Sequence, residues 1–189
     1  MFFNRLNKKT DEELMSLVQQ GDSRAMTELY HRYDHRLLRY FYRMLWKEEA
    51  MAQDFLHDLF VKIIEHAGQF KPDRKFSTWI YSVAHNMCKN EYRKQAFRSV
   101  TKTSLPDPDP IEGIHEEIER KEFQQALEEA LDHLDEDDKH LFTLRHALEM
   151  PLDEIALTLN CPAGTVKSRL FYLKKKLAKH LYTFHIEKK

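Results

Sequence analysis

The chain has 189 residues, of which 42% are hydrophobic and 32% charged. This balance is typical of a folded globular protein and is too apolar for a disordered chain. Only 4 glycines and 6 prolines argue against a loop-rich β protein and a glycine-rich nucleotide site. No apolar run approaches the roughly 18 residues of a membrane span, no signal peptide is recognisable, and two cysteines make no disulfide framework. We expect a mostly helical, cytoplasmic protein.

Charge is distributed unevenly along the chain, although the formal net charge is only −1. Residues 1–98 carry 17 Lys and Arg against 13 Asp and Glu, and residues 99–117 carry 1 against 5. Residues 118–160 are acidic, with 4 against 12, whereas residues 161–189 are basic, with 8 against 1. Such segregation is typical of chains with directional partners, and the basic end indicates nucleic acid, although a charge run can also be a solvated helix face.

The first block, from Asp11 to about Arg98, has apolar residues at helical spacing. Gly21 and Asp22 indicate a helix end followed by an N-cap, because glycine tolerates the left-handed region and aspartate accepts hydrogen bonds from free N–H groups. A long helix follows, with an apolar residue at every fourth position. This stripe consists of Leu29, Tyr33, Leu37, Phe41 and Leu45.

Two further helices are predicted in the first block. One covers residues 51–66. After a loop from Phe70 to Phe76, Ser77 or Thr78 is expected to cap the other, which runs from Trp79 to about Lys94. The residues expected to face inward are Ala52, Leu56, Leu59 and Ile63 in the first helix, and Ile80, Val83, Ala84 and Met87 in the second.

Residues 99–117 interrupt the helical pattern. Between 106 and 110, three prolines alternate with two aspartates, a pattern that favours extended, polyproline-like chain. Helical spacing resumes over residues 118–131 and 138–148. The sequence therefore predicts an all-α protein in which two small helical domains are joined by a flexible Pro/Asp-rich linker.

The last segment has the pattern of a helix-turn-helix. Leu152–Leu159 predicts a short amphipathic helix, Asn160 and Cys161 predict a tight turn, and Pro162 suits the first position of a new helix. Two helices joined by three or four residues, the second strongly basic, are typical of DNA-binding proteins. The apolar stripe of the second helix consists of Val166, Leu170, Leu173, Leu177 and Leu181.

The face opposite this stripe mixes basic, hydroxyl and aromatic side chains. Lysine and arginine neutralise phosphates or contact guanine, whereas serine and phenylalanine contact base edges and thymine methyl groups. The alternative is an ordinary surface helix whose lysines extend into solvent. The residues on this face and its flanks are Lys167, Ser168, Arg169, Phe171, Tyr172, Lys175 and Lys179.

The motifs, in this order, resemble the extracytoplasmic-function (ECF) group of bacterial sigma factors, sigma-70-type proteins with regions two and four only. Gln53–Lys62 and Phe76–Asn86 are similar to the core-binding and promoter-reading parts of region two. Leu152–Ala156 and Gly164–Leu170 are similar to region four. The resemblance covers residues 11–97 and 118–181, and the short linker leaves no room for the extra helical domain of larger sigma factors.

The resemblance implies an RNA polymerase sigma factor, which directs core polymerase to specific promoters and assists DNA opening. It implies region two over residues 1–98, a linker over 99–117, and region four over 118–189. The implied partners are core RNA polymerase, promoter DNA and an anti-sigma factor, without direct membrane insertion. No enzymatic activity and no cofactor are expected.

Three sets of site residues follow from the resemblance. It implies that the outward face of the 51–66 helix binds the coiled coil of the largest core polymerase subunit, and that the 79–94 helix places Asn86 beside a pocket for a base flipped from the −10 strand. The core-binding set is Asp54, His57, Asp58, Val61 and Glu65. The −10 set is Lys75, Asn86, Lys89 and Arg93. The −35 set is Lys167, Ser168, Arg169, Phe171, Tyr172 and Lys175.

Two other functions stay open at this point. A stand-alone helix-turn-helix regulator would not need the motifs at 52–62 and 76–93, and a helical enzyme would need a catalytic signature that the sequence lacks. Eleven histidines are scattered without the spacing of a metal site, so none is expected. The acidic stretch 118–160 suits docking on polymerase or on an inhibitor, and the sequence does not separate the two.

Overall fold

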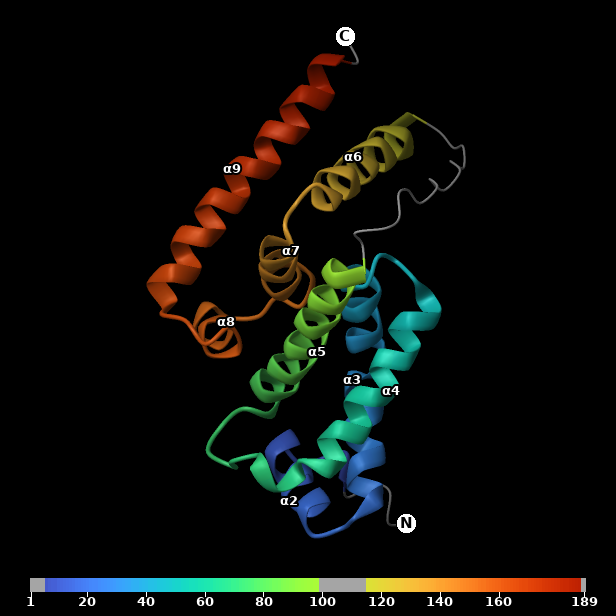
Figure 1. Ribbon diagram of the computed structural model, residues 1–189, viewed down its shortest axis with the longest axis vertical. Helices are drawn as coiled ribbons and strands as arrows, with labels where there is room; N and C mark the ends of the chain where they lie inside the picture. The colour runs from blue at the N-terminus through green and yellow to red at the C-terminus, as the bar shows by residue number, and fades with distance from the viewer. Residues whose placement is uncertain (1–5, 99–114, 188–189) are drawn as a thin grey trace.

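The computed structural model describes residues 6–98 and 115–187, and within these ranges every regular element is a helix, as predicted (Figure 1). The N-terminal domain contains α2 (Asp11–Gln19), α3 (Ser23–Met44), α4 (Glu49–Glu65), the 3-10 turn η1 (Ala67–Gln69) and α5 (Phe76–Arg98). The C-terminal domain contains α6 (His115–Asp132), α7 (Glu136–Phe142), the π-helical segment η3 (Thr143–Ala147), α8 (Leu152–Thr158) and α9 (Ala163–Glu187).

The predicted linker lies largely outside the described residues, since 99–114 are not among them. Helix α6 begins at His115, within the stretch 99–117. The expected helix over 138–148 is divided, because α7 ends at Phe142 and η3 continues with π-helical geometry.

Local signals start α3 where the sequence predicted it. Gly21 has φ of 87°, in the left-handed region that glycine tolerates. Asp22 caps α3, and its carboxylate accepts a hydrogen bond from the backbone N–H of Arg24 at 2.9 Å. The whole predicted stripe of α3 is buried, so this helix forms the centre of the N-terminal domain.

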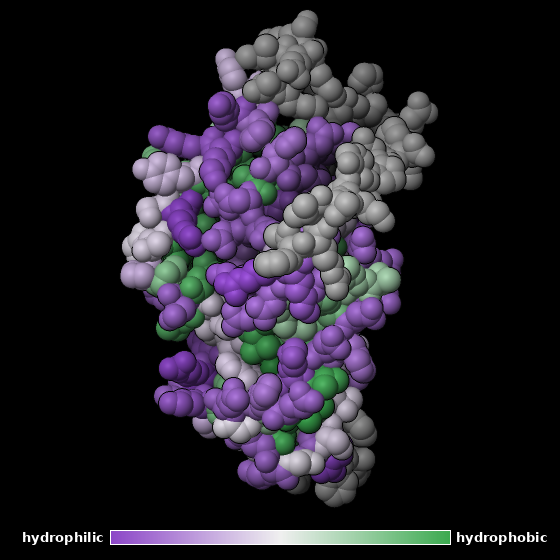
Figure 2. Space-filling view, viewed as in Figure 1, coloured by the Kyte–Doolittle hydropathy of each residue, from purple (hydrophilic) through white to green (hydrophobic). Residues whose placement is uncertain are grey.

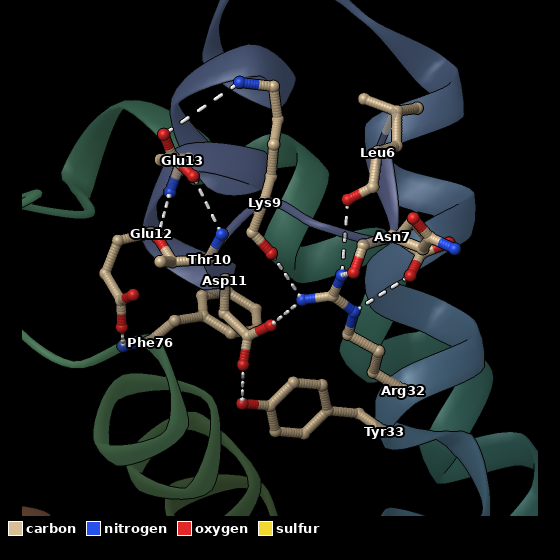
Figure 3. A network of polar contacts seen from close by, with 11 residues as sticks. Leu6, Asn7, Lys9, Thr10, Asp11, Glu12, Glu13, Arg32, Tyr33 and Phe76 are labelled. Atoms are coloured by element: carbon tan, nitrogen blue, oxygen red, sulfur yellow. Dashed lines mark hydrogen bonds and ion pairs between the residues drawn. The ribbon is translucent and has the colours of Figure 1, made fainter. Parts of the chain in front are cut away.

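Helix α5 begins at Phe76, and the expectation that Ser77 or Thr78 caps a helix from Trp79 is wrong. Ser77 and Thr78 lie in its first turn, and Thr78 is buried. The cap comes from another helix: the backbone N–H of Phe76 donates to a carboxylate oxygen of Glu12 in α2 at 2.9 Å (Figure 3). A negative charge is favourable at a helix N-terminus, which explains why the helix starts three residues early.

Arg32 of α3 holds the segment that precedes α2 (Figure 3). Its guanidinium donates to the carboxylate of Asp11 at 2.7 Å and to the carbonyls of Lys9 and Asn7 at 2.9 and 3.0 Å. The Tyr33 hydroxyl donates to the second oxygen of Asp11. These contacts fix α2 against α3, and through Glu12 they also fix the start of α5.

The two domains pack against each other, a feature that the sequence analysis did not predict. Helix α5 contacts α8, and α3 contacts α7. In Figure 1, α5 lies between the rest of its own domain and the short helices of the other. The buried apolar residues form one continuous core that includes Leu37 and Phe41 of α3 and Leu141 of α7. The described residues therefore form a closed arrangement of the two domains.

Candidate DNA and polymerase interfaces

The exposed face of α9 presents the residues predicted to read the −35 element. Val166 and Leu173 of the apolar stripe are 0% and 1% exposed, which turns the opposite face outward. Phe171 and Tyr172 are 55% and 63% exposed, unusual values for large aromatic residues. The other four predicted residues, Lys167, Ser168, Arg169 and Lys175, are exposed as well.

Two side-chain contacts organise this face. The Lys175 ammonium lies 4.7 Å from the centre of the Phe171 ring, a cation–π arrangement that holds both groups on one side of the helix. The Ser168 hydroxyl donates to the carbonyl of Thr165 at 3.0 Å and keeps its lone pairs as acceptors. The face therefore offers a charge for phosphates beside groups that can contact base edges.

The flank of α9 is bound to α7 by ion pairs. Arg169 lies 3.5 Å from the carboxylate of Asp137. Lys176 lies 3.0 Å from Asp135 and also contacts Asp138. Arg169 is thus exposed but already paired within its own domain, unlike Lys175.

The face of α5 that carries Asn86 is directed toward the C-terminal domain. Asn86, Lys89 and Arg93 are exposed. On the same side of the helix, the Ser82 hydroxyl donates to the carbonyl of Thr158 in α8 at 3.2 Å. The neighbouring His85 ring stacks on His140 of α7, with 3.8 Å between ring centres. The structure therefore brings these three predicted −10 residues together, beside the other domain.

Lys75, the fourth predicted −10 residue, lies apart from the other three. It precedes α5, about 15 Å along the helix axis from Asn86. Its ammonium contacts the carboxylate of Glu154 in α8, and this contact raises the pKa of Lys75. Lys75 is therefore engaged by the C-terminal domain as well.

A groove of about 930 Å³ runs between the two domains. One wall is basic and comes from the N-terminal domain, with Arg43, Lys47, Lys89 and Arg93. The other wall comes from the α6–α7 corner of the C-terminal domain and is mainly acidic, although Lys139 also lines it. We call its acidic residues the acidic corner: Asp132, Asp135, Glu136 and Asp137.

The outward face of α4 has the character predicted for a protein interface. All five predicted core-binding residues are exposed, and Val61 is 40% exposed. Val61 also lines an apolar hollow of about 480 Å³, with Met26, Tyr30 and Phe60. Ile64, which the sequence analysis did not single out, is 57% exposed at the same place. Its helical position, three residues after Val61, was the signal that could have found it.

The face of the molecule seen in Figure 1 is mainly hydrophilic, as Figure 2 shows. Among the described residues, no group of three or more His, Cys, Asp and Glu side chains is placed to hold a metal ion. No helix in the described ranges is long and apolar enough to cross a membrane. Burial raises the pKa of the Cys88 thiol to about 12, so this thiol stays protonated and unreactive.

In a comparison with known proteins, each of the two domains matches a family model. Residues 29–98 match the family model for sigma-70 region 2, and residues 124–177 match that for sigma-70 region 4. The RNA polymerase sigma-H factor of Pseudomonas aeruginosa is 31% identical over 186 residues, which cover 93% of this chain and 96% of that protein. The ECF RNA polymerase sigma-E factor of Escherichia coli is 31% identical over 176 residues, covering 86% and 89%.

Two solved structures share the fold. CnrH, solved in complex with the cytosolic domain of CnrY, matches with a TM-score of 0.70 at 22% identity over 93% of this chain and 99% of that one. The sigma factor RpoE of Bartonella quintana, solved in complex with the anti-sigma factor NepR, matches with 0.61 at 21% identity over 82% and 97%.

An all-helical chain with sigma-70 region 2 in its first domain and region 4, with a helix-turn-helix, in its second defines the class of sigma-70-type transcription factors. Within that class, the chain belongs to the ECF sigma factors of bacterial RNA polymerase.

Proposed function

We propose that this sigma factor acts in the cytoplasm as a dissociable, non-enzymatic subunit of RNA polymerase, with promoter DNA and an anti-sigma factor as further partners. The observation that supports this best is the presence of two separate DNA-type faces in one chain. The α9 face combines exposed Phe171 and Tyr172 with lysines, and the α5 face combines Asn86 with Lys89 and Arg93.

Each face suits a different form of DNA. A helix whose exposed side mixes lysine, serine and aromatic residues fits the major groove of a −35 duplex. An amide beside two cations fits a single strand, because the amide can pair with an unstacked base while the cations neutralise phosphates. The proposal includes region two over residues 1–98, a linker over 99–117 and region four over 118–189.

Core polymerase is assigned to the α4 face. Val61 and Ile64 supply an apolar centre, and Asp54, Asp58 and Glu65 surround it with negative charge. An apolar centre with a charged rim is the usual anatomy of a protein interface, and the charges set orientation and association rate. A stand-alone regulator would have no use for this face, which makes that alternative the weaker one.

Transcription from genomic DNA tests the proposal and does not require a known promoter sequence. Core polymerase of the source organism is supplied with its genomic DNA, with and without the chain, and the 5′ ends of the RNA are sequenced. We expect new 5′ ends that share two upstream elements. Identical 5′ ends with and without the chain would overturn the proposal.

Substitutions assign the faces within the same assay. Val61→Glu should weaken association with core polymerase at an unchanged melting temperature, since surface substitutions typically change stability by less than about 0.5 kcal/mol. Tyr42→Glu is a matched control, because Tyr42 is also 40% exposed but lies on α3. Asn86→Ala should change the base preference at one −10 position, and Ser168→Ala or Phe171→Ala should reduce discrimination at the −35 element by about 1–3 kcal/mol.

A further inference from the structure

The groove between the two domains has the size and the lining of a small-molecule site. Its volume of about 930 Å³ falls within the range of about 300–1,000 Å³ that ligand pockets occupy. Apolar and aromatic side chains lie among its charged residues. They are Met44, Trp46 and Tyr92 of the N-terminal domain and Leu134 of the C-terminal domain. Because both domains line the groove, it exists only in their packed arrangement, which we call the closed state.

The carboxylates of the acidic corner are already paired with cations of the protein itself. Three of them form ion pairs: Asp132 with Lys47 at 2.9 Å, Asp135 with Lys176 at 3.0 Å, and Asp137 with Arg169 at 3.5 Å. Burial raises the pKa of the fourth carboxyl, Glu136, and Lys139 lies near enough to oppose this rise. The negative charge of the acidic corner is therefore largely balanced within the chain.

Three cations on the opposite wall are not balanced in this way. Arg43, Lys89 and Arg93 line the groove and are exposed, and none of them forms an ion pair with another residue that the structure describes. Lys89 and Arg93 lie four positions apart on α5, so they are neighbours one helical turn apart. Arg43 comes from the last turn of α3. The groove therefore has unpaired positive charge on one wall, which favours an anionic ligand.

An aromatic pair in the same groove is fixed in place. The rings of Trp46 and Tyr92 meet edge to face with 5.4 Å between their centres, and the Tyr92 hydroxyl donates to the carbonyl of Met44. Trp46 and Lys47 have φ of 53° and 59°, in the left-handed region that is costly for residues other than glycine. Such conformations persist only where their surroundings hold them, and they cluster at functional sites. The turn between α3 and α4 is thus a fixed part of the groove.

Unpaired cations beside a fixed aromatic ring have the chemistry that recognises a nucleotide. Guanidinium and ammonium groups bind phosphate oxygens, and an aromatic side chain stacks on a nucleobase. We propose that the groove is a binding site for a nucleoside polyphosphate, with its phosphates at Arg43, Lys89 and Arg93 and its base against Trp46. Lys89 and Arg93 also belong to the predicted −10 set, so a bound nucleotide competes with single-stranded DNA for them. Only this competition rests on the proposed function; the site itself does not.

Zero-length crosslinking tests whether the groove exists in solution. A carbodiimide joins an amine to a carboxylate only where the two are in contact, and peptide mass spectrometry identifies the pair. The expected interdomain crosslinks join Lys75 to Glu154 and Lys47 to Asp132. The pair Lys176 and Asp138 lies within the C-terminal domain and is the internal standard. Absence of the interdomain crosslinks from the free chain would overturn the site.

Isothermal titration calorimetry with the full chain measures binding. The probes are adenosine triphosphate, inorganic tripolyphosphate and adenosine. The nucleotide should bind about 3-fold or more tightly than tripolyphosphate, because stacking adds to the phosphate contacts, and adenosine should bind most weakly. Trp46→Leu should remove this preference and keep the binding of tripolyphosphate, which also shows that the variant is folded. Equal binding of nucleotide and tripolyphosphate by the unchanged chain would overturn the role of Trp46, and no binding of either would overturn the site.

A charge-matched pair of variants locates the phosphates. Arg43→Gln with Lys139→Gln removes two cations that line the groove, one from each domain, and leaves the predicted −10 set intact. The control, Arg39→Gln with Lys174→Gln, also removes one exposed cation from each domain, but neither residue lines the groove. The first variant should bind the nucleotide about 5-fold or more weakly than the unchanged chain, and the control should stay within about 2-fold of it. Equal affinities of the two variants would overturn the site.

A parallel titration separates a nucleotide site from a path for DNA. The probe is a fluorescent 20-nucleotide single strand of random sequence. The Arg43→Gln, Lys139→Gln variant and its control should bind this strand with affinities within about 2-fold of each other, because both keep Lys89 and Arg93. If the groove variant loses affinity for the strand and for the nucleotide by the same factor, the groove is part of the DNA path and the proposal is wrong.

This proposal and the proposed function fail in different ways. Both double variants keep the predicted core-binding, −10 and −35 residues, so both should support transcription from genomic DNA with core polymerase. If transcription occurs but the unchanged chain binds no nucleotide, the groove site is wrong and the proposed function stands. If no chain gives transcription, the proposed function is wrong, and calorimetry alone decides the groove site.

Discussion

The two faces that this sigma factor offers to DNA differ in what lies next to them. The α9 face is open, since Phe171 and Tyr172 are more than half exposed. The α5 face lies beside the acidic corner, and its neighbours Ser82 and His85 contact the C-terminal domain directly. The comparison teaches that, of two predicted DNA-binding faces in one chain, one can be open to solvent while the other is packed beside another part of the same chain.

Loss of the Tyr40 hydroxyl should reduce the difference in exposure between the α5 and α9 faces more than any other change. Tyr40→Phe leaves Nδ1 of the buried His140 without its partner, which costs about 1–3 kcal/mol. We expect a lower melting temperature and fewer interdomain crosslinks. Tyr42→Phe is the matched control, because the Tyr42 ring is 40% exposed. The prediction is wrong if the two variants melt and crosslink alike.

Acid should also open the closed state. Burial lowers the pKa of His140 well below its ordinary value, and the nearby His85 lowers it further. Burial lowers the pKa of His85 too; Asp137 opposes this shift and Lys89 reinforces it. Tyr40 and Cys88 also face the cluster, and both stay protonated, because burial raises their pKa values.

The direction of the pH effect follows from these shifts. An open chain binds protons on both histidines below about pH 6.5, whereas the closed chain binds them less readily because the pKa of each histidine is lowered. The stability of the closed state is therefore complete above this pH and falls as the pH drops below it. Small-angle scattering should show a larger radius of gyration at pH 5.5 than at pH 7.5. His85→Gln should weaken this dependence, and His31→Gln, at an exposed position, should preserve it.

Substituting one lysine on each face should show how far the α9 and α5 faces differ in their access to DNA. Lys175→Ala should weaken binding of the free chain to duplex DNA by about 3- to 10-fold at low salt and reduce the salt slope by about one unit. Lys89→Ala should change binding to a single strand by less than about 2-fold, because Lys89 lines a groove opposite the acidic corner. In the Asp132→Asn, Glu136→Gln background the Lys89 effect should grow. A large Lys89 effect in the otherwise unchanged chain would contradict this expectation.

A similarly small effect is expected at Arg169. Its guanidinium lies 3.5 Å from Asp137, so part of its charge is used within the domain. Arg169→Ala should therefore weaken duplex binding less than Lys175→Ala, by about 2-fold or less, because exposed ion pairs are weak but still compete with phosphates. Titrations of the two variants across the same salt series decide this. An Arg169 effect equal to that of Lys175 would show that Asp137 does not restrain it.

The helical spacing of apolar residues was sufficient to predict those helices whose position depends on local residues alone. The α9 stripe follows a helical repeat, and its burial fixes which side faces outward, so the exposure of Phe171, Tyr172 and Lys175 could be predicted. The α3 stripe and the Asp22 cap follow for the same reason. The roles of these residues toward DNA and polymerase stay predictions.

Contacts between distant segments could not be predicted. Helix α5 starts early because its cap is Glu12, which lies 64 positions before Phe76. His85 and His140 stood among eleven scattered histidines, and no spacing indicates that two residues 55 positions apart will stack. The partner of the acidic stretch was left open because charge alone does not identify which basic surface it meets.

The number of residues that separate two contacting side chains along the sequence affects when their contact can form during protein synthesis. The contacts of Arg32 join residues 4 to 26 positions apart, whereas the Tyr40–His140 hydrogen bond joins residues 100 positions apart. Short loops close at a smaller entropic cost, and domains fold from the N-terminus as the ribosome adds about 5–20 residues per second. The N-terminal domain can therefore fold several seconds before α7 leaves the ribosome. During that interval the contacts of α5 with α7 and α8 are absent, so Ser82 and His85 are more exposed in the nascent chain than in the finished protein.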